Sequence, residues 1–494
     1  MNRTRLCLYI LLFTPLLVYW QTIFTEYGFH DDYSNMREAR EEPGKLVKFT
    51  TSHGRPLYGA LLETSLSKVD EVESLQWIRL TTVALLTILG IALWRQLYQS
   101  GWTEIEAAVI GLGVTLLPAA QVEAGWAIGW PHVLALLLSL AGFAATEAEL
   151  ERGGMKRTIA MIGGGLIYAL ATLIYQSNAL FALVPIVAIL LVRDGREPAT
   201  DRRWTIIHLA VLFAGMLAAF LLVKFLFSTG IFHPAERFRF ETNPFTKLVW
   251  FFWEPLPNAL GLYFLRDDNN VGFVLLIVAI LIVGTLIAYG YRNVVEVKKS
   301  MVKKKWQLCL LIAPFVAHAV SFAAGERSVG YRTIFALSGL VLMFLVFALR
   351  TLLASGRLQL TAYYIGLIVL TLTAAITAHL NVTTLIAQPQ NYEWELVRGA
   401  VMRADFKKPN RVYLIRPTSA DRSTDRTFVD EFGAVSADSD WVPQEMFKAA
   451  LHERFPKKLP AGGSYTVASG REVPNEKDYD LIIDLRKLKQ RREP

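Results

Sequence analysis

Long apolar runs recur along most of the chain and restrict its fold more than any other feature of the sequence. A helix needs about 20 apolar residues to cross a bilayer, and runs of this kind follow one another as far as residue 385. Hydrophobic residues make up 53% of the chain and charged residues only 19%, which is too apolar for an ordinary soluble protein. We therefore expect an all-α polytopic membrane protein with about eleven transmembrane helices. The expected spans are residues 6–24, 76–97, 103–120, 130–147, 158–175, 179–192, 205–229, 271–291, 306–323, 330–349 and 361–385.

Basic residues lie mainly in the loops after every second expected span. The positive-inside rule places such loops in the cytoplasm, together with the N-terminus. The first span follows Arg3 and Arg5 and lacks a small-x-small cleavage site, so it predicts an uncleaved anchor. The basic residues of these loops also explain the net charge of +8. We expect them to contact anionic lipid rather than nucleic acid. We expect an integral protein of a bacterial cytoplasmic (inner) membrane. The basic loop residues are Arg95, Arg152, Lys156, Arg157, Arg193, Arg196, Arg202, Arg203, Arg292, Lys298, Lys299, Lys303, Lys304, Lys305, Arg350 and Arg357.

Two long segments are expected on the external side. Residues 25–75 contain two charged stretches, 33–42 and roughly 63–75, which are typical of helices lying on the membrane surface. Residues 230–270 mix aromatic and basic residues, a composition that suits a segment dipping into the membrane interface. Both segments are placed to cover a cavity.

The composition changes near residue 388. Residues 1–387 are expected to form the transmembrane domain, and residues 388–494 a small extracytoplasmic α/β domain. This second region contains no Gly-rich phosphate loop and no metal-spaced Cys and His, so we assign it no chemistry. Its expected elements are helices at 392–405 and 443–455 and strands at 412–415 and 481–483.

Asp31 and Asp32 form an acidic pair directly after the first span. Carboxylates at the mouth of a span are expensive to desolvate, so they point to proton transfer, cation binding or contact with a polar substrate. An Asp before a helix that begins near Tyr33 is also a common N-cap, which is the structural alternative for either residue. A carboxylate beside an apolar wall can remove a proton from a hydroxyl, and two adjacent acids also permit a divalent cation.

The loop that carries this pair resembles the first external loop of the GT-C membrane glycosyltransferases. The resemblance rests on Asp31-Asp32-Tyr33, Ala39-Arg40-Glu41, Gly44 and Gly54-Arg55-Pro56-Leu57-Tyr58. It covers about the first 80 residues by motif and the remaining spans by topology. The chain is similar in these features to bacterial O-antigen glucosyltransferases and to the lipid A aminoarabinose and protein mannosyltransferases, which use polyprenyl-phosphate sugars.

This resemblance implies a role for three of the residues. Asp31 would be the catalytic base, and Asp32 a supporting or acceptor-binding residue. Arg55 would contact the lipid phosphate or the sugar, and its planar fork of donors suits the charge of a departing phosphate. With enough such cations no metal cofactor is required, although a divalent metal remains an open alternative.

Further candidates lie at the external ends of other spans. Arg327 and Tyr331 would share a face of the tenth helix if that helix begins early, and Arg332 is preferred for phosphate contact because it lies further into the apolar run. Lys224 and His53 complete the candidates. The alternative is that the cations snorkel to lipid headgroups and that His53 faces solvent. Glu123, His132 and His318 are expected to be interhelical hydrogen-bonding residues rather than ligands.

Together these features predict a metal-independent, inverting glycosyltransferase. It would move a sugar from a polyprenyl monophosphate to a glycan or lipid-linked acceptor on the extracytoplasmic side. Two alternatives stay open: a polysaccharide polymerase or ligase that uses pyrophosphate-linked glycans, and a transporter of lipid or glycan that forms no covalent product. Asp31, Arg55 and Arg332 are predicted to line one cavity.

Overall fold

A computed structural model of the chain describes most of its residues. The described residues are 2–148, 150, 154–193, 198–236, 239–267, 270–297, 300–327, 330–353, 357–418, 421 and 430–492. Four of the basic residues on which the predicted orientation depends, Arg152, Arg196, Lys298 and Lys299, lie outside them.

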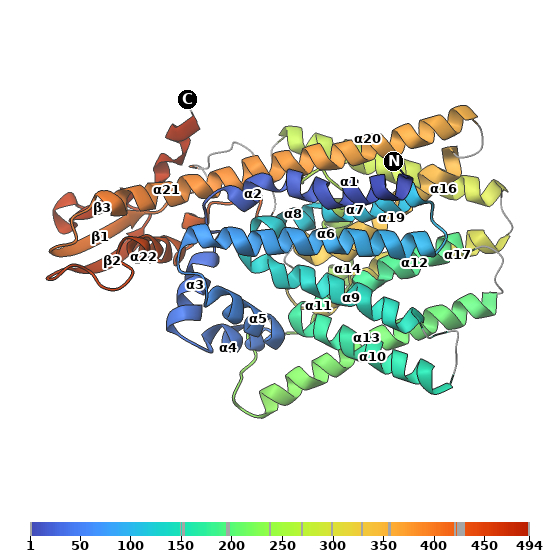
Figure 1. Cartoon of the computed structure of the whole chain (residues 1–494), viewed down its shortest axis with the longest axis horizontal. Coiled ribbons are helices and arrows are strands. Elements are labelled where there is room, and N and C mark those ends of the chain that lie inside the picture. Colours follow the sequence, from blue (N-terminus) through green and yellow to red (C-terminus); the bar gives the residue numbers. More distant parts are fainter. Residues whose placement is uncertain are drawn as a thin grey trace.

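The chain folds into an elongated helical bundle with a small α/β unit at one end (Figure 1). The short helices α3, α4 and α5 lie at the end of the bundle that carries the α/β unit, and the N-terminus lies at the other end. The predicted all-α membrane fold with a small C-terminal α/β region is therefore confirmed.

Every expected span overlaps a helix. Among the described residues, 7 helices are long and apolar enough to cross a membrane, or up to 8 if the bent pair α7 and α8 counts as one span. The number is lower than expected partly because the first span divides at Tyr19 into α1 and α2, and the sixth is a short apolar helical stretch, Gln176–Val192. The helices of the bundle are α1 (Arg3–Val18), α2 (Trp20–Phe24), α6 (Leu75–Gln99), α7 (Glu104–Thr115), α8 (Pro118–Gly125), α9 (Trp130–Ala148), α10 (Gly154–Ile174), α11 (Gln176–Ala179), α12 (Leu183–Val192), α13 (Pro198–Ser228), α16 (Asn270–Val297), α17 (Ser300–Ala317), α18 (Ala319–Ala323), α19 (Phe335–Leu353) and α20 (Arg357–Val382).

A break between α7 and α8 lets the chain turn into the interior of the bundle, near the end that carries the α/β unit. Proline has no N–H and favours the first position of a helix, so Pro118 ends one helix and begins the next at an angle of 50°. The whole of α8 is buried, and the 3₁₀ helix η2 (Ala127–Gly129) then leads into α9. This buried turn carries residues 123–132 to the candidate site.

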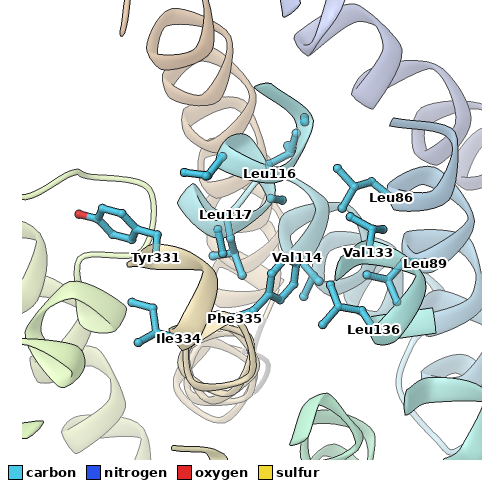
Figure 2. Packing of buried hydrophobic residues seen from close by; sticks show 14 of the residues in the cluster. Leu86, Leu89, Val114, Leu116, Leu117, Val133, Leu136, Tyr331, Ile334 and Phe335 are labelled. Carbon is cyan, nitrogen blue, oxygen red and sulfur yellow. The ribbon is translucent and has the colours of Figure 1, made fainter. Parts of the chain in front are cut away.

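The centre of the bundle is a packed apolar core formed by α6, α7, α9 and α19 (Figure 2). Leu86, Val114, Leu136 and Phe335 are among its fully or almost fully buried side chains. Close-packed aliphatic and aromatic side chains of this kind hold helices at fixed distances. The core therefore provides a rigid base beneath the site.

The segment between α2 and α6 forms three surface helices rather than the two expected. They are α3 (Asp32–Glu41), α4 (Lys45–Ser52) and α5 (Pro56–Leu66). The helix expected at 63–75 was wrong in its position, because α5 begins at Pro56, a favoured first residue. Helix α4 was missed; it follows Gly44, which adopts a left-handed φ of 85°.

Residues 230–270 contain α14 (Pro244–Trp253) and α15 (Pro255–Leu260). The α14 side chains of Phe245, Phe252 and Trp253 are exposed. On its other face Lys247 is buried, and its Nζ donates a hydrogen bond of 2.9 Å to the Ala324 carbonyl. An exposed aromatic face is the feature expected of an interfacial helix.

The C-terminal unit contains a parallel sheet of three strands in the order β2-β1-β3. Strands β1 (Pro409–Ile415) and β3 (Leu481–Asp484) agree with the expected strands, whereas the half-exposed β2 (Ser464–Gly470) was missed. Helix α20 continues through the π-turn η5 (Thr383–Ala387) into α21 (Gln388–Arg403), so no loop separates the bundle from this unit.

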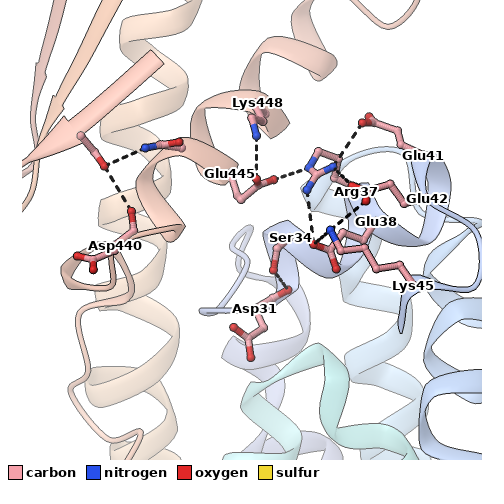
Figure 3. A network of polar contacts seen from close by, with 12 residues as sticks. Asp31, Ser34, Arg37, Glu38, Glu41, Glu42, Lys45, Asp440, Glu445 and Lys448 are labelled. Carbon is pink, nitrogen blue, oxygen red and sulfur yellow. Dashed lines mark hydrogen bonds and ion pairs between the residues drawn. The ribbon is translucent and has the colours of Figure 1, made fainter. Parts of the chain in front are cut away.

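An ion-pair network joins the C-terminal unit to the surface helices (Figure 3). Arg37 of α3 lies 2.6 Å from Glu445 of α22 (Val442–Arg454) and 2.6 Å from Glu42. Lys448 lies 2.8 Å from the other Glu445 oxygen. Such a network is worth more than isolated surface pairs, and it holds α22 beside α3 above the site.

Candidate active site

A cavity of about 750 Å³ opens between the surface helices, the buried turn and α22. It is called the polar cavity below. Asp31, Arg55, His132, Arg332 and Trp441 line it, so four regions far apart in the sequence meet there. The predicted convergence of Asp31, Arg55 and Arg332 on one cavity is what the structure shows.

A second cavity of about 500 Å³ lies beside α10, α13 and α18 and is called the apolar cavity below. Phe213, Leu217 and Phe220 are among its lining side chains. His53 and Arg55 line both cavities. One guanidinium therefore lies at the boundary of two cavities, the second of which is also lined by Arg239 and Glu326.

Asp31 occupies the N-cap position of α3 without acting as a side-chain cap. Its side chain makes no capping hydrogen bond, and its carbonyl accepts from the Ser34 hydroxyl at 3.1 Å and from the Asn35 N–H at 2.8 Å. Figure 3 shows the Asp31 carboxylate turned away from the Arg37 network. The carboxylate is thus placed to face a ligand in the polar cavity.

Asp32 has a different environment and does not line the polar cavity. Its side chain is fully buried, and it accepts a hydrogen bond of 2.9 Å from the Phe29 N–H. Burial raises the pKa of Asp32 to about 7, against the lowering effects of that hydrogen bond and of the nearby Arg79 cation. The contacts describe a residue that holds the turn before α3, in which His30 has a φ of 44°.

Arg55 is held in place by neutral partners. Its Nε donates to the Gln176 side-chain oxygen at 3.2 Å, and the Gln176 amide donates to the Gly54 carbonyl at 2.9 Å. Its guanidinium carbon lies 4.5 Å from the centre of the Tyr175 ring. No described carboxylate lies within ion-pair distance of Arg55. Its charge is therefore available to an anionic ligand.

Arg332 also lines the polar cavity, but it has a carboxylate partner. Its Nη2 lies 2.6 Å from Glu431, and its guanidinium lies 4.6 Å from the centre of the Trp126 ring. Its Nε has no hydrogen-bond partner among the described residues. Glu431 offsets part of the positive charge of Arg332. Arg332 therefore contributes mainly a hydrogen-bond donor rather than a net positive charge.

Of the remaining candidates, only His53 joins this group. His53 lines both cavities, with Nδ1 2.9 Å from the Phe49 carbonyl. Lys224 lies 5.6 Å from the Phe220 ring and lines neither cavity. Arg327 is 43% exposed and lies 3.4 Å from Glu241.

Tyr331 is buried and lines neither cavity. Its hydroxyl accepts from the Arg266 N–H at 2.9 Å, and its own N–H donates to Asp430 at 2.6 Å. The 3₁₀ helix η4 (Tyr331–Ile334) begins at this residue, so Arg327 precedes the helix. The expected shared helical face of Arg327 and Tyr331 is therefore absent.

Sequence reasoning missed some residues of the polar cavity. Glu123 of α8 and His132 of α9 make the kind of interhelical hydrogen bond that was expected of each, but His132 also lines the cavity. Trp441 and Glu445 come from the C-terminal unit. No local pattern identifies them, because their place depends on how that unit docks.

The described residues contain no candidate metal-binding site. No group of three or more His, Cys, Asp and Glu side chains there has an arrangement that could hold a metal ion. The charged residues that line the polar cavity are Asp31, Glu38, Lys45, Arg55, Arg332 and Glu445. Behind this lining, Glu431 pairs with Arg332 and the buried Glu123 with His132.

The comparisons with known proteins found similarity to solved structures but no match by sequence. No protein-family model and no curated protein matches the chain. Solved structures of similar arrangement include the oligosaccharyltransferase of Archaeoglobus fulgidus in complex with Zn and sulfate, at 10% identity and a TM-score of 0.44 over 91% of this chain and 61% of that chain. Another is ArnT from Cupriavidus metallidurans in the apo state, at 14% identity and a TM-score of 0.40 over 90% of this chain and 84% of that one.

Both are GT-C enzymes. The chain spans 61% of the length of the archaeal oligosaccharyltransferase. Because these TM-scores lie below 0.5, the likeness carries no argument about activity, which rests on the residues of the site.

Proposed function

We propose that this protein is a membrane glycosyltransferase of GT-C type. It transfers a sugar from a polyprenyl monophosphate to a hydroxyl of a glycan or lipid-linked acceptor, with inversion at the anomeric carbon, on the extracytoplasmic side of the membrane. The proposal unites the resemblance of the first external loop with the two cavities.

The observation that carries the proposal is the position of Arg55. Its guanidinium has no described carboxylate partner and lines both cavities. A polyprenyl-phosphate sugar has three parts that match this arrangement: an apolar chain, an anionic phosphate and a polar sugar. In this arrangement the chain occupies the apolar cavity, Arg55 binds the phosphate, and the sugar enters the polar cavity.

The reaction is a single displacement. The Asp31 carboxylate removes the proton from the acceptor hydroxyl, and the oxygen attacks the anomeric carbon from the face opposite the phosphate. The bond between that carbon and the phosphate oxygen breaks, and the polyprenyl phosphate leaves with the electron pair. Arg55 and the Nε of Arg332 stabilise the charge that develops on it. No metal is assigned a part in this step.

Replacement of Asp31 tests the proposal. In membranes supplied with polyprenyl-phosphate sugars, Asp31→Asn should lower the transfer rate by about 100-fold or more, within the range of general base catalysis. The thermal unfolding temperature should stay close to that of the wild type, because the side chain caps no helix. The matched control is Glu41→Gln on the exposed side of α3, which should transfer normally.

Two outcomes would contradict the proposal. Wild-type rates for Asp31→Asn would remove Asp31 as the base. Transfer only from pyrophosphate-linked donors, with none from monophosphate donors, would favour a polymerase or ligase instead. Product should be followed as label moved from lipid to acceptor, since transport alone forms no such product.

A further inference from the structure

Glu123 and His132 form a buried pair at the wall of the polar cavity. Both Glu123 oxygens lie 3.0 to 3.1 Å from Nδ1 of His132, and both side chains are almost fully buried. The turn between α8 and α9 holds them together tightly: a Cβ on Gly129 would lie 2.6 Å from a Glu123 carboxylate oxygen. The pair is thus part of a closely packed structure.

Two aromatic rings enclose the imidazole. The Tyr58 ring stacks on the imidazole, with 4.8 Å between the ring centroids and an interplanar angle of 16°. The centroid of the Tyr175 ring lies 4.2 Å from that of the imidazole. Tyr175 in turn supports the Arg55 guanidinium at 4.5 Å. The two rings therefore fix the orientation of the imidazole. The Tyr175 ring contacts both the imidazole and Arg55, which is the proposed phosphate-binding residue.

The second ring nitrogen of His132 has no such partner. Since Nδ1 faces a carboxylate, the Nδ1–H donates to Glu123 and Nε2 keeps its lone pair. Nε2 is buried without a hydrogen-bond partner among the described residues, yet His132 lines the polar cavity. A buried acceptor without a partner costs free energy, so a ligand that brings a donor to this point gains binding energy.

We propose that His132 is a further substrate-binding residue of this transferase, with Glu123 as its positioning residue. Its Nε2 accepts a hydrogen bond from a hydroxyl of the sugar that the polyprenyl phosphate carries. The inference rests on the proposed function and adds the sugar's place within the polar cavity.

The chemistry favours a hydroxyl over the phosphate at this position. A phosphodiester anion offers only acceptors, and Nε2 of this tautomer is itself an acceptor. Arg55 and His132 line the same cavity and both contact the Tyr175 ring, so a sugar joined to a phosphate at Arg55 would lie on the side of the cavity where His132 is found.

Measuring the affinity of the purified full-length protein for two lipids distinguishes a substrate-binding role of His132 from a structural one. The lipids are undecaprenyl monophosphate and the same lipid bearing the sugar that the wild type transfers. His132→Phe keeps a ring between Tyr58 and Tyr175 but removes the acceptor. It should weaken binding of the sugar-bearing lipid by about 10-fold or more and leave binding of the bare lipid within about twofold. His132→Gln restores an acceptor and should recover part of the loss.

His318→Phe is the matched control. His318 is another buried histidine near the external end of a span, enclosed by Trp250 and Phe251, and it lines neither cavity. It should bind both lipids as the wild type does. Nitrogen-15 spectra of histidine-labelled protein should show the Nδ1–H tautomer for the signal lost in His132→Phe, and Glu123→Gln should lower its population.

Unchanged binding of the sugar-bearing lipid by His132→Phe would overturn the inference and leave the proposed function standing. An equal loss for both lipids would also overturn it, because that result describes a structural role. A wild-type protein that binds neither lipid would instead contradict the proposed function itself.

Discussion

At the scale of single residues, Asp31 and Asp32 show how adjacent acids acquire different environments. Successive side chains on a helix diverge by about 100°, so only one of the two lines the polar cavity while the other enters the protein. The sequence motif identified the pair, and the resemblance gave Asp31 the role of base and Asp32 a supporting role. The burial of Asp32 could not be predicted from the motif. Arg55 was identified by the same motif, whereas the freedom of its charge depends on the absence of a described carboxylate nearby.

Burial of Asp32 predicts a pH-dependent stability. Its pKa in the folded protein is about 7, above the ordinary value of 3.8, because burial penalises the charged form. The unfolded chain therefore releases this proton first, and the folded state loses stability as the pH rises from about 4 to about 7. Thermal unfolding of the detergent-solubilised protein should show a loss of about 3 kcal/mol between pH 5 and 8 from this group.

Asp32→Asn keeps an acceptor for the Phe29 N–H and should flatten that part of the profile. Asp70→Asn is the control, since Asp70 is exposed, with 78% of its side chain accessible. If Asp32→Asn and the wild type lost equal stability over this pH range, the raised pKa would be disproved.

At the scale of elements, the position of Arg55 depends on the close approach of α4 and α5. A Cβ on Gly59 would lie 2.0 Å from the Thr50 hydroxyl and 2.8 Å from the Leu46 carbonyl, so only glycine fits. The sequence did not indicate α4, because a stretch of 8 residues has little helical periodicity to read. The start of α5 at Pro56 was also missed, because the helix was expected only from about residue 63. By contrast, α21, α22, β1 and β3 were each recognisable from longer or more apolar patterns.

Gly59→Ala should therefore force α4 and α5 apart. Overpacking of this kind costs about 1 to 3 kcal/mol, and the transfer rate should fall as Arg55 moves at the start of α5. Gly366→Ala in α20 is the matched control, because no atom lies within 4 Å of the added Cβ. Unfolding temperature and transfer rate are the measurements, and equal behaviour of the two variants would refute the close-packing argument.

At the scale of the whole molecule, the helices orient the site. Figure 1 places α3 to α5 and the C-terminal unit at one end of the bundle and the N-terminus at the other. With the positive-inside rule, this arrangement leads to the proposal that the polar cavity opens on the extracytoplasmic side.

Accessibility of introduced cysteines tests this orientation. The two native cysteines, Cys7 and Cys309, are buried, and both Lys48 and Lys156 are exposed. In intact cells a membrane-impermeant maleimide should label Lys48→Cys and spare Lys156→Cys. Inside-out vesicles should reverse the result. The same labelling of both variants from the outside would be incompatible with the proposed topology.

The membrane class, the helices of the bundle, the change of character near residue 388 and the acidic loop could all be predicted from the sequence. Hydrophobic content, charge and turn residues act over short distances along the chain, so their effects can be read locally. The division of the first external segment into three helices and the strand β2 could not be read in this way.

The composition of the site depends on contacts between residues that are far apart in the chain. Asp31, Arg55, His132, Arg332 and Trp441 meet only when α3, α5, α9, η4 and the C-terminal unit pack together. The same packing gives Arg332 a carboxylate partner, leaves Arg55 without a described one and buries Asp32. Burial and charge pairing are properties of three-dimensional neighbours, which no local pattern in a chain of this length specifies.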